Sequence, residues 1–297
     1  MGKKRFKILD TFPDFLAYWT QARSKSVNEQ IRAWQKSYMG KYPELMDKQI
    51  KSYEKENEDW LRIAEKILPS LPDRVHLMRK ARGNILSACE LIYEKASMTL
   101  ELDFQILFLI YVGIGCGAGW ATTYEGKPAI LLGLENIAER RWHTKKKLKG
   151  LISHEIGHLA HMTWRNEWET FEDKEQDPLF QLYSEGFAQK CEHLILGRET
   201  WHIGQDKGWL SWCSERESWL AGEYLKRVEE KQPVNDFYGS WFSIQGRTHT
   251  GYFLGHAFVS ELEKTRSLME IALLDLDEVR KHTVQFLNII AGRSTKQ

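Results

Sequence analysis

The stretch that decides the fold and the chemistry of this chain is Leu151-Ile-Ser-His-Glu-Ile-Gly-His-Leu-Ala-His161. His154 and His158 are four residues apart, so on an α-helix both imidazoles project from one face and can share a tetrahedral metal ion. Glu155 lies one step around the helix, where a carboxylate can take a proton from a metal-activated water. We therefore predict a helix from about Lys145 to Trp164 that holds one zinc ion per chain.

A catalytic zinc site needs a third protein ligand, which a second segment must supply. The metzincin pattern is excluded, because His161 stands where that pattern has glycine and Trp164 where it has the third histidine. We interpret His161 as a histidine outside the ligand set. The best candidate for the third ligand is Glu185, within Leu182-Tyr-Ser-Glu-Gly-Phe-Ala-Gln189.

The surroundings of Glu185 favour a ligand over an exposed glutamate. Asp177 and Pro178 have the residue types of an N-cap and a first helical position, and Gly197 is typical of a helix end. Glu185 then lies mid-helix beside Gly186, which permits close helix packing. A carboxylate among glycine, phenylalanine and alanine is costly unless it is paired or metal-bound.

Other polar residues are candidates for the surroundings of the metal. Tyr252 opens a helix predicted from Gly251 to Lys264, and its hydroxyl can stabilise a developing oxyanion. His249 is the alternative donor. A core aromatic residue is the equally weighted alternative interpretation of Tyr252. Glu135, at a strand-to-helix junction, is either a substrate contact or a helix cap. Gln189 or Glu192 can bind the second ring nitrogen of a ligand histidine.

These motifs resemble those of the gluzincin peptidases. His154-Glu-Ile-Gly-His158 and Ser184-Glu-Gly-Phe-Ala188 are similar to the two zinc motifs of the gluzincin aminopeptidases, although an acid-rich segment, Thr163–Asp177, lengthens the spacing. The order of motifs over about residues 104–262 resembles the YjaZ-like group of predicted zinc-dependent proteases. The resemblance implies a zincin-like fold and peptidase activity, with Glu185 as third ligand.

The predicted fold is mainly α (α+β). Apolar residues at helical spacing, such as Phe12, Phe15 and Trp19, predict a helical N-terminal part. The β-branched and aromatic run Phe104–Val112, a glycine-rich stretch and Pro128–Leu132 predict a small β-hairpin or sheet before the active-site helix. We expect a helical region over 1–100 and a zincin-like metallopeptidase domain over 101–297, with helices at its C-terminal end.

Composition narrows the function classes. With 42 basic and 41 acidic residues the net charge is +1, which does not favour nucleic-acid binding. The four cysteines form no Cys-x-x-Cys pair, no secretory signal is evident, and the longest apolar run is too short to span a membrane. These features predict a cytoplasmic protein without a membrane partner, and they leave the oligomeric state open.

The pattern as a whole predicts a zinc metalloprotease, a hydrolase acting on a peptide or protein substrate, with Glu155 as general base. Two alternatives stay open: a non-enzymatic, zinc-stabilised interaction or regulatory protein, and a hydrolase of a non-peptide amide. The intact Glu155 argues against the first, because a structural zinc site has no use for a general base and is usually closed by four protein ligands. The sequence distinguishes neither exopeptidase from endopeptidase nor one peptide substrate from another.

Overall fold

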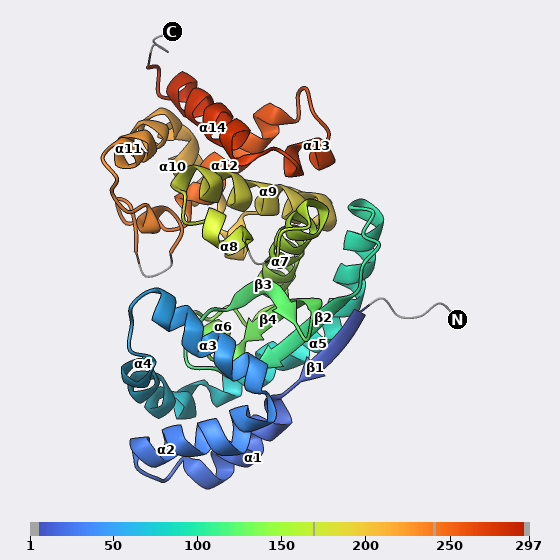
Figure 1. Cartoon of the computed structure of the whole chain (residues 1–297), viewed down its shortest axis with the longest axis vertical. Helices are drawn as coiled ribbons and strands as arrows, with labels where there is room; N and C mark the ends of the chain where they lie inside the picture. The colour runs from blue at the N-terminus through green and yellow to red at the C-terminus, as the bar shows by residue number, and fades with distance from the viewer. Residues whose placement is uncertain (1–5, 169, 240–241, 294–297) are drawn as a thin grey trace. The chain divides into compact units, whose positions relative to one another are not determined.

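The computed structural model describes residues 6–168, 170–239 and 242–293 (Figure 1). These residues form many helices and one small mixed sheet, which confirms the mainly helical α+β class. The chain divides into two compact units, Met1–Ile152 and Ser153–Gln297, and the boundary lies inside α7 (Lys145–Arg165). Among the described residues, no helix combines the length and the apolar character needed to cross a bilayer.

The sheet of unit 1 has the strand order β1-β2-β4-β3. Its strands are β1 (Phe6–Asp10), β2 (Ile106–Tyr111), β3 (Gly119–Tyr124) and β4 (Lys127–Gly133). β1, β2 and β4 run parallel, with Phe6 opposite Ile106 and Leu107 opposite Ala129. β3 is antiparallel to β4. The two central strands are almost completely buried, which explains why they read as continuous apolar runs.

The predicted sheet is present, but the predicted pairing needs correction. The two strands recognised in the sequence, β2 and β4, are parallel neighbours and form no hairpin with each other. The hairpin is formed by β3 and β4, around a turn in which Glu125 and Gly126 have φ of 49° and 68°. Positive φ at both central residues is typical of the turns that join tight hairpins. β3 was missed because glycines lead into it.

The N-terminal segment belongs to the same core as the sheet, which differs from the domain boundary expected at residue 100. That position lies within unit 1, between α5 (Leu71–Thr99) and β2. β1 pairs with β2 along its whole length, and Asp10 at its end forms an ion pair with Arg82 of α5 at 2.5 Å. This pairing joins residues about one hundred positions apart, so no local pattern could indicate it.

The described residues of unit 1 also form the helices α1 to α6, named here in chain order. They are α1 (Phe12–Ala22), α2 (Val27–Ala33), α3 (Pro43–Lys55), α4 (Trp60–Ile67), α5 and α6 (Leu134–Glu139). The helical spacing noted in the sequence is confirmed in α1, which buries Phe12, Phe15 and Trp19. Phe15 stacks on Trp19 and meets Tyr38 edge-on. These aromatic residues fill the core of unit 1.

A fully buried carboxylate holds the loop that follows β2. Oε1 of Glu135, at the start of α6, accepts a hydrogen bond from the Gly115 amide at 3.1 Å. A Cβ at Gly113 would lie 2.9 Å from the same oxygen, so the loop can approach this closely only with glycine. Burial raises the pKa of Glu135 to about 7, although the amides of Gly113 and Gly115 oppose the shift. This geometry favours a structural role for Glu135.

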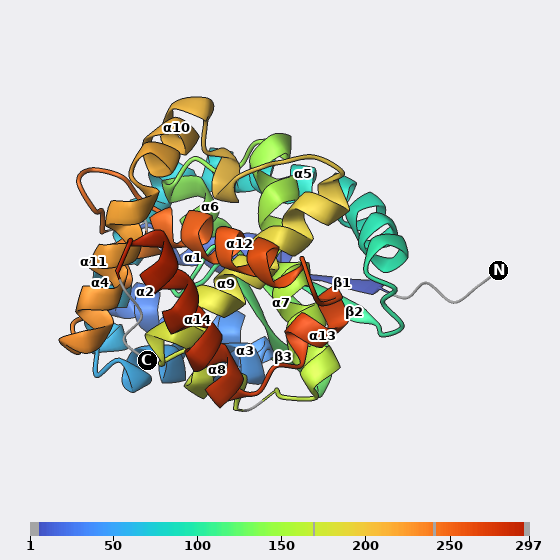
Figure 2. The ribbon, with the colours of Figure 1, turned by 90° about the horizontal axis from the view of Figure 1, so that it is seen from above.

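Unit 2 contains the C-terminal part of α7 and the remaining helices. They are α8 (Phe171–Lys174), α9 (Pro178–Leu196), α10 (Lys207–Glu215), α11 (Glu217–Glu229), α12 (Thr250–Leu262), α13 (Leu268–Ala272) and α14 (Leu276–Ile290). α9 packs against both α12 and α14 (Figures 1 and 2). The predicted ends of α9 are confirmed: Asp177 caps the Leu179 amide, and Gly197 ends the helix with φ of 66°.

Glycines let the three helices of the metal motifs approach one another closely. A Cβ at Gly186 of α9 would overlap the backbone of Gly255 on α12. A Cβ at Gly157 of α7 would lie 2.8 Å from Ala188 Cα of α9. Real Cβ atoms do not approach backbone this closely, so the backbones meet directly at both crossings. The role expected for Gly186 in close helix packing is thereby confirmed.

The buried Glu135 predicts a specific pH dependence of stability. Its pKa is higher in the folded than in the unfolded chain, so its contribution is fully present below about pH 4.5 and is lost as the pH rises through about 7. Glu135→Gln should therefore gain stability relative to wild type over this range, by about 3 kcal/mol. Urea unfolding at pH 5 and pH 8 measures the difference. An exposed glutamate of the same unit, changed by Glu65→Gln, should follow wild type; equal gains at both pH values would contradict the assignment.

The glycine crossing predicts a large cost for a single methyl group. Gly186→Ala forces α9 away from the Gly255 backbone, and overpacking typically costs about 1–3 kcal/mol, with rigid backbone at the upper end. Gly222→Ala is the matched control, because its new Cβ meets only Ala291 Cβ at 3.7 Å and helix propensity improves. Thermal unfolding of both variants tests this. Unchanged stability in Gly186→Ala would show that the crossing is looser than described.

Candidate metal centre

Three ligand atoms from two helices converge in unit 2. α7 supplies His154 and His158, and α9 supplies Glu185. Nε2 of His154 lies 3.1 Å from Nε2 of His158 and 3.0 Å from Oε2 of Glu185. Nε2 of His158 lies 3.4 Å from the same oxygen. The structure therefore brings together the three residues that the sequence predicted as ligands.

The size of this triangle fits a metal ion. Ligands at about 2.0–2.2 Å from a tetrahedral zinc ion lie roughly 3.3–3.5 Å from one another. The separations in the triangle are 3.0, 3.1 and 3.4 Å, so two of them are a few tenths of an ångström shorter than this spacing and the third matches it. The Nε2 atoms of His154 and His158 face each other, as two ligands of a common cation do. Two histidines and a glutamate form a donor set that zinc accepts.

The charges of the triangle are strongly coupled. Burial lowers the pKa of His154, although its hydrogen bond to Glu185 opposes the shift. For His158 the effect of burial is outweighed by the hydrogen bond and negative charge of Glu185, and its pKa rises to about 9. Burial also raises the pKa of Glu185, but the two histidines bring it well below its usual range. Glu185 is thus an ionised carboxylate at the centre of the group.

Glu155, the predicted general base, is buried on α7 directly after His154. Its negative charge contributes to the raised pKa of both His158 and Tyr252. Glu155 therefore lies near the ligand triangle without belonging to it. This is the relation that a base needs if it is to take a proton from a group bound to the metal.

Tyr252 and His249, the two candidate oxyanion donors, both lie at this site. Tyr252 of α12 is buried, its ring centroid is 5.3 Å from that of His154, and its hydroxyl bonds to Glu185. Burial and the charge of Glu185 raise its pKa well above the usual value, so the hydroxyl keeps its proton. His249 precedes α12 with φ of 63°, and its ring centroid is 5.6 Å from that of Tyr252.

His202, which the sequence did not single out, also belongs to this group. Its ring stacks on Tyr252 with centroids 4.3 Å apart and an interplanar angle of 4°. It is 4.6 Å from the ring of His154 and 5.3 Å from that of His249. His202 lies in a short turn, η4 (His202–Gly204), where no periodicity marks it. Its neighbour Ile203 has φ of 57°, which is rare for a β-branched residue and often occurs at functional sites.

α9 holds the loop that carries His202. Oε1 of Gln189 accepts a hydrogen bond from the His202 amide at 3.1 Å, and its Nε2 donates to the Thr200 carbonyl at 2.8 Å. The Thr200 hydroxyl donates to Oε1 of Glu192 at 2.8 Å. Gln189 therefore positions this loop and not a ligand histidine, whereas Oε2 of Glu192 faces Nδ1 of His154 at 3.9 Å. Burial raises the pKa of Glu192 to about 7.

The acid-rich segment between the two zinc motifs also reaches the site. Ser184 donates a hydrogen bond to Oε1 of Glu175 at 2.6 Å, and its hydroxyl lies 3.4 Å from Nδ1 of His158. Burial raises the pKa of Glu175 to about 7. Glu175 is one of six acidic residues from Thr163 to Asp177, and the sequence offers no signal that distinguishes it from the others.

Two further residues lie outside the triangle. His161 shares a hydrogen bond of 3.0 Å with the Tyr183 hydroxyl, and its ring is surrounded by Phe171, Phe180 and Phe187. It belongs to neither of the groups that could hold a metal among the described residues. Glu135 is in unit 1, where its carboxylate binds its own loop, so its role as a substrate contact stays a prediction.

Comparison with known proteins finds no matching family model, no similar curated protein and no similar solved structure. The zincin-like fold and the gluzincin relationship therefore stay predictions that rest on the sequence motifs. The site itself is described by its residues: a triangle of two histidines and a glutamate, a neighbouring glutamate, and a tyrosine and two histidines beside it.

Proposed function

We propose that this chain is a zinc-dependent peptidase of the gluzincin type, similar to the YjaZ-like proteases. The observation that carries the proposal is the triangle of His154, His158 and Glu185, whose ligand atoms converge to within a few tenths of an ångström of the spacing around one tetrahedral ion. Zinc ions with three protein ligands are typically catalytic, because the fourth coordination position stays open for water or substrate. The substrate that we propose is a peptide or protein, bound with its scissile carbonyl at that position.

The chain's residues divide the work of hydrolysis. A zinc ion held by the triangle would polarise the carbonyl and lower the pKa of a water molecule to about 7. Glu155 takes the proton of the attacking water and passes it to the leaving amine. The protonated hydroxyl of Tyr252, which bonds to Glu185 in this structure, would turn to donate to the oxygen on which negative charge develops. Burial of these groups strengthens each of these electrostatic interactions.

Two observations favour this proposal over a structural zinc site. The group contains three ligand side chains among the described residues, whereas structural sites usually have four. Glu155 and Tyr252 are both buried near the triangle. Burial of a carboxylate lowers the stability of the fold, and a purely structural site needs no such carboxylate beside its ligands. Hydrolysis of a non-peptide amide would use the same groups, so substrate screening must distinguish it.

The central test combines metal analysis with a change of the general base. Purified protein should contain one tightly bound zinc ion, which His158→Ala and Glu185→Ala should each lose. Glu155→Gln should keep the metal and the fold but lower kcat by about 10²–10⁴-fold, because it removes only the proton acceptor. Cleavage of quenched peptide libraries and elemental analysis provide the measurements. Wild-type turnover in Glu155→Gln would show that another group is the base.

The donor role of Tyr252 predicts an effect on kcat more than on KM. Tyr252→Phe keeps the packing of the ring against His202 but removes the hydroxyl, so kcat should fall by roughly 10²–10³-fold with little change in stability. His249→Ala, assayed beside it, should have the smaller effect. A normal kcat in Tyr252→Phe with a large loss in His249→Ala would move the donor role to His249.

A further inference from the structure

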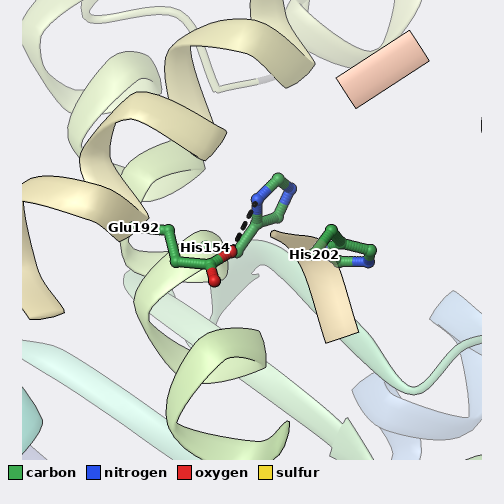
Figure 3. A group of neighbouring side chains, drawn as sticks. All are labelled: His154, Glu192 and His202. Carbon is green, nitrogen blue, oxygen red and sulfur yellow. Dashed lines mark ion pairs between the residues drawn. The ribbon is translucent and has the colours of Figure 1, made fainter. Parts of the chain in front are cut away.

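A second group of ligand-type atoms lies behind the triangle, on the opposite nitrogen of His154. It consists of His154, Glu192 and His202, and one ligand atom from each lies within 4.8 Å of the others (Figure 3). Their exposed fractions are only 2%, 1% and 6%. His154 is on α7, Glu192 is on α9, and His202 is in the loop after α9.

The separation of His154 and Glu192 is unusual for a hydrogen bond. Nδ1 of His154 lies 3.9 Å from Oε2 of Glu192, beyond the range of a hydrogen bond. Neither atom has a hydrogen-bond partner among the described residues, although an unsatisfied buried polar atom is costly. Two atoms bound to one ion at about 2.0–2.1 Å lie roughly 3.3 Å apart at tetrahedral angles and about 4.1 Å apart across the ion. The distance of 3.9 Å is closer to the wider of these two separations.

The residues behind this group are fixed in place. The Thr200 hydroxyl holds the other oxygen of Glu192 at 2.8 Å, which leaves Oε2 directed at His154. Gln189 holds the His202 amide, and the ring of Tyr252 stacks flat against the His202 imidazole. The three ligands therefore need little reorganisation to bind a cation, which reduces the entropic cost of binding.

We propose that His154, Glu192 and His202 form a second metal site that accepts a divalent first-row ion such as Zn²⁺ or Cu²⁺. Two imidazoles and one carboxylate are a donor set that these ions favour. His154 would bridge the two sites through its two nitrogens. On binding, the Nδ1–H bond of His154 breaks, the proton goes to solvent and a metal–nitrogen bond forms; no electron is transferred. A cation already at Nε2 makes this proton easier to lose.

Repulsion between the two cations and the need to release a proton make the second site weaker than the first. Its occupancy would fix His202 and thereby the surface on which Tyr252 stacks. The site shares His154 with the proposed catalytic centre, but it does not depend on peptidase activity. A metal titration can therefore test it even if no peptide is cleaved.

The test is a titration of the metal-free, full-length protein with Zn²⁺ alone, followed by calorimetry and by competition with a chromophoric chelator. Wild type should bind two equivalents, the second at least tenfold more weakly. Glu192→Gln and His202→Phe should each keep the tight equivalent and lose the weak one, while His202→Phe retains the aromatic stack. Glu185→Gln should impair the tight equivalent. Glu135→Gln is the matched control, a buried glutamate in the other unit, and should bind as wild type does.

Three results would overturn the proposal. One is a single equivalent in wild type even at millimolar Zn²⁺. Another is a single equivalent whose affinity falls about 10–100-fold in Glu192→Gln, which would make Glu192 a hydrogen-bond acceptor for ligand His154. The third is a second equivalent that survives both Glu192→Gln and His202→Phe, which would place it elsewhere. Circular dichroism of each variant establishes that it is folded before the titration is interpreted.

Discussion

The candidate metal centre depends on backbone-to-backbone contact between helices. α9 meets α12 where Gly186 faces Gly255, and it meets α7 where Gly157 faces Ala188. These crossings set the separation of the helices that carry the two ligand histidines, Glu185 and Tyr252. The ligand atoms that these helices carry lie 3.0–3.4 Å from one another. The glycines thus help to set the geometry of the site.

A second constraint follows from the first, since close packing buries charged groups. Glu155, Glu185 and Glu192 are packed among histidines in unit 2. An unpaired buried carboxylate is costly, and removal of a single partner leaves the other charge uncompensated. Positive charge offsets this cost, either from protonated His158 or from a bound cation. The burial of these carboxylates beside histidine rings is the electrostatic reason to expect metal ions here.

All ligand-type residues of the two metal groups belong to unit 2, whereas the sequence assigned a zincin-like domain to everything after residue 100. The sheet that was expected to accompany the active-site helix is in unit 1, where β1 joins it to the N-terminal segment. Glu135 is also in unit 1, where its carboxylate accepts a hydrogen bond from the glycine-rich loop that follows β2. The proposed chemistry is accordingly assembled from helices and one loop.

The sequence by itself determined the helices of the centre and the identity of its triangle. These features are encoded by neighbouring residues: the i, i+4 spacing of His154 and His158, the cap at Asp177 and the helix end at Gly197. Patterns of this kind can be recognised without knowledge of the tertiary structure. Only the tertiary structure decided which distant residues join them. His202 enters through a loop folded back onto α9, and Glu175 through Ser184. In unit 1 the tertiary structure likewise decided that β1 pairs with a strand about one hundred residues away. Such contacts depend on chain reversal and long-range pairing, which residue spacing does not encode.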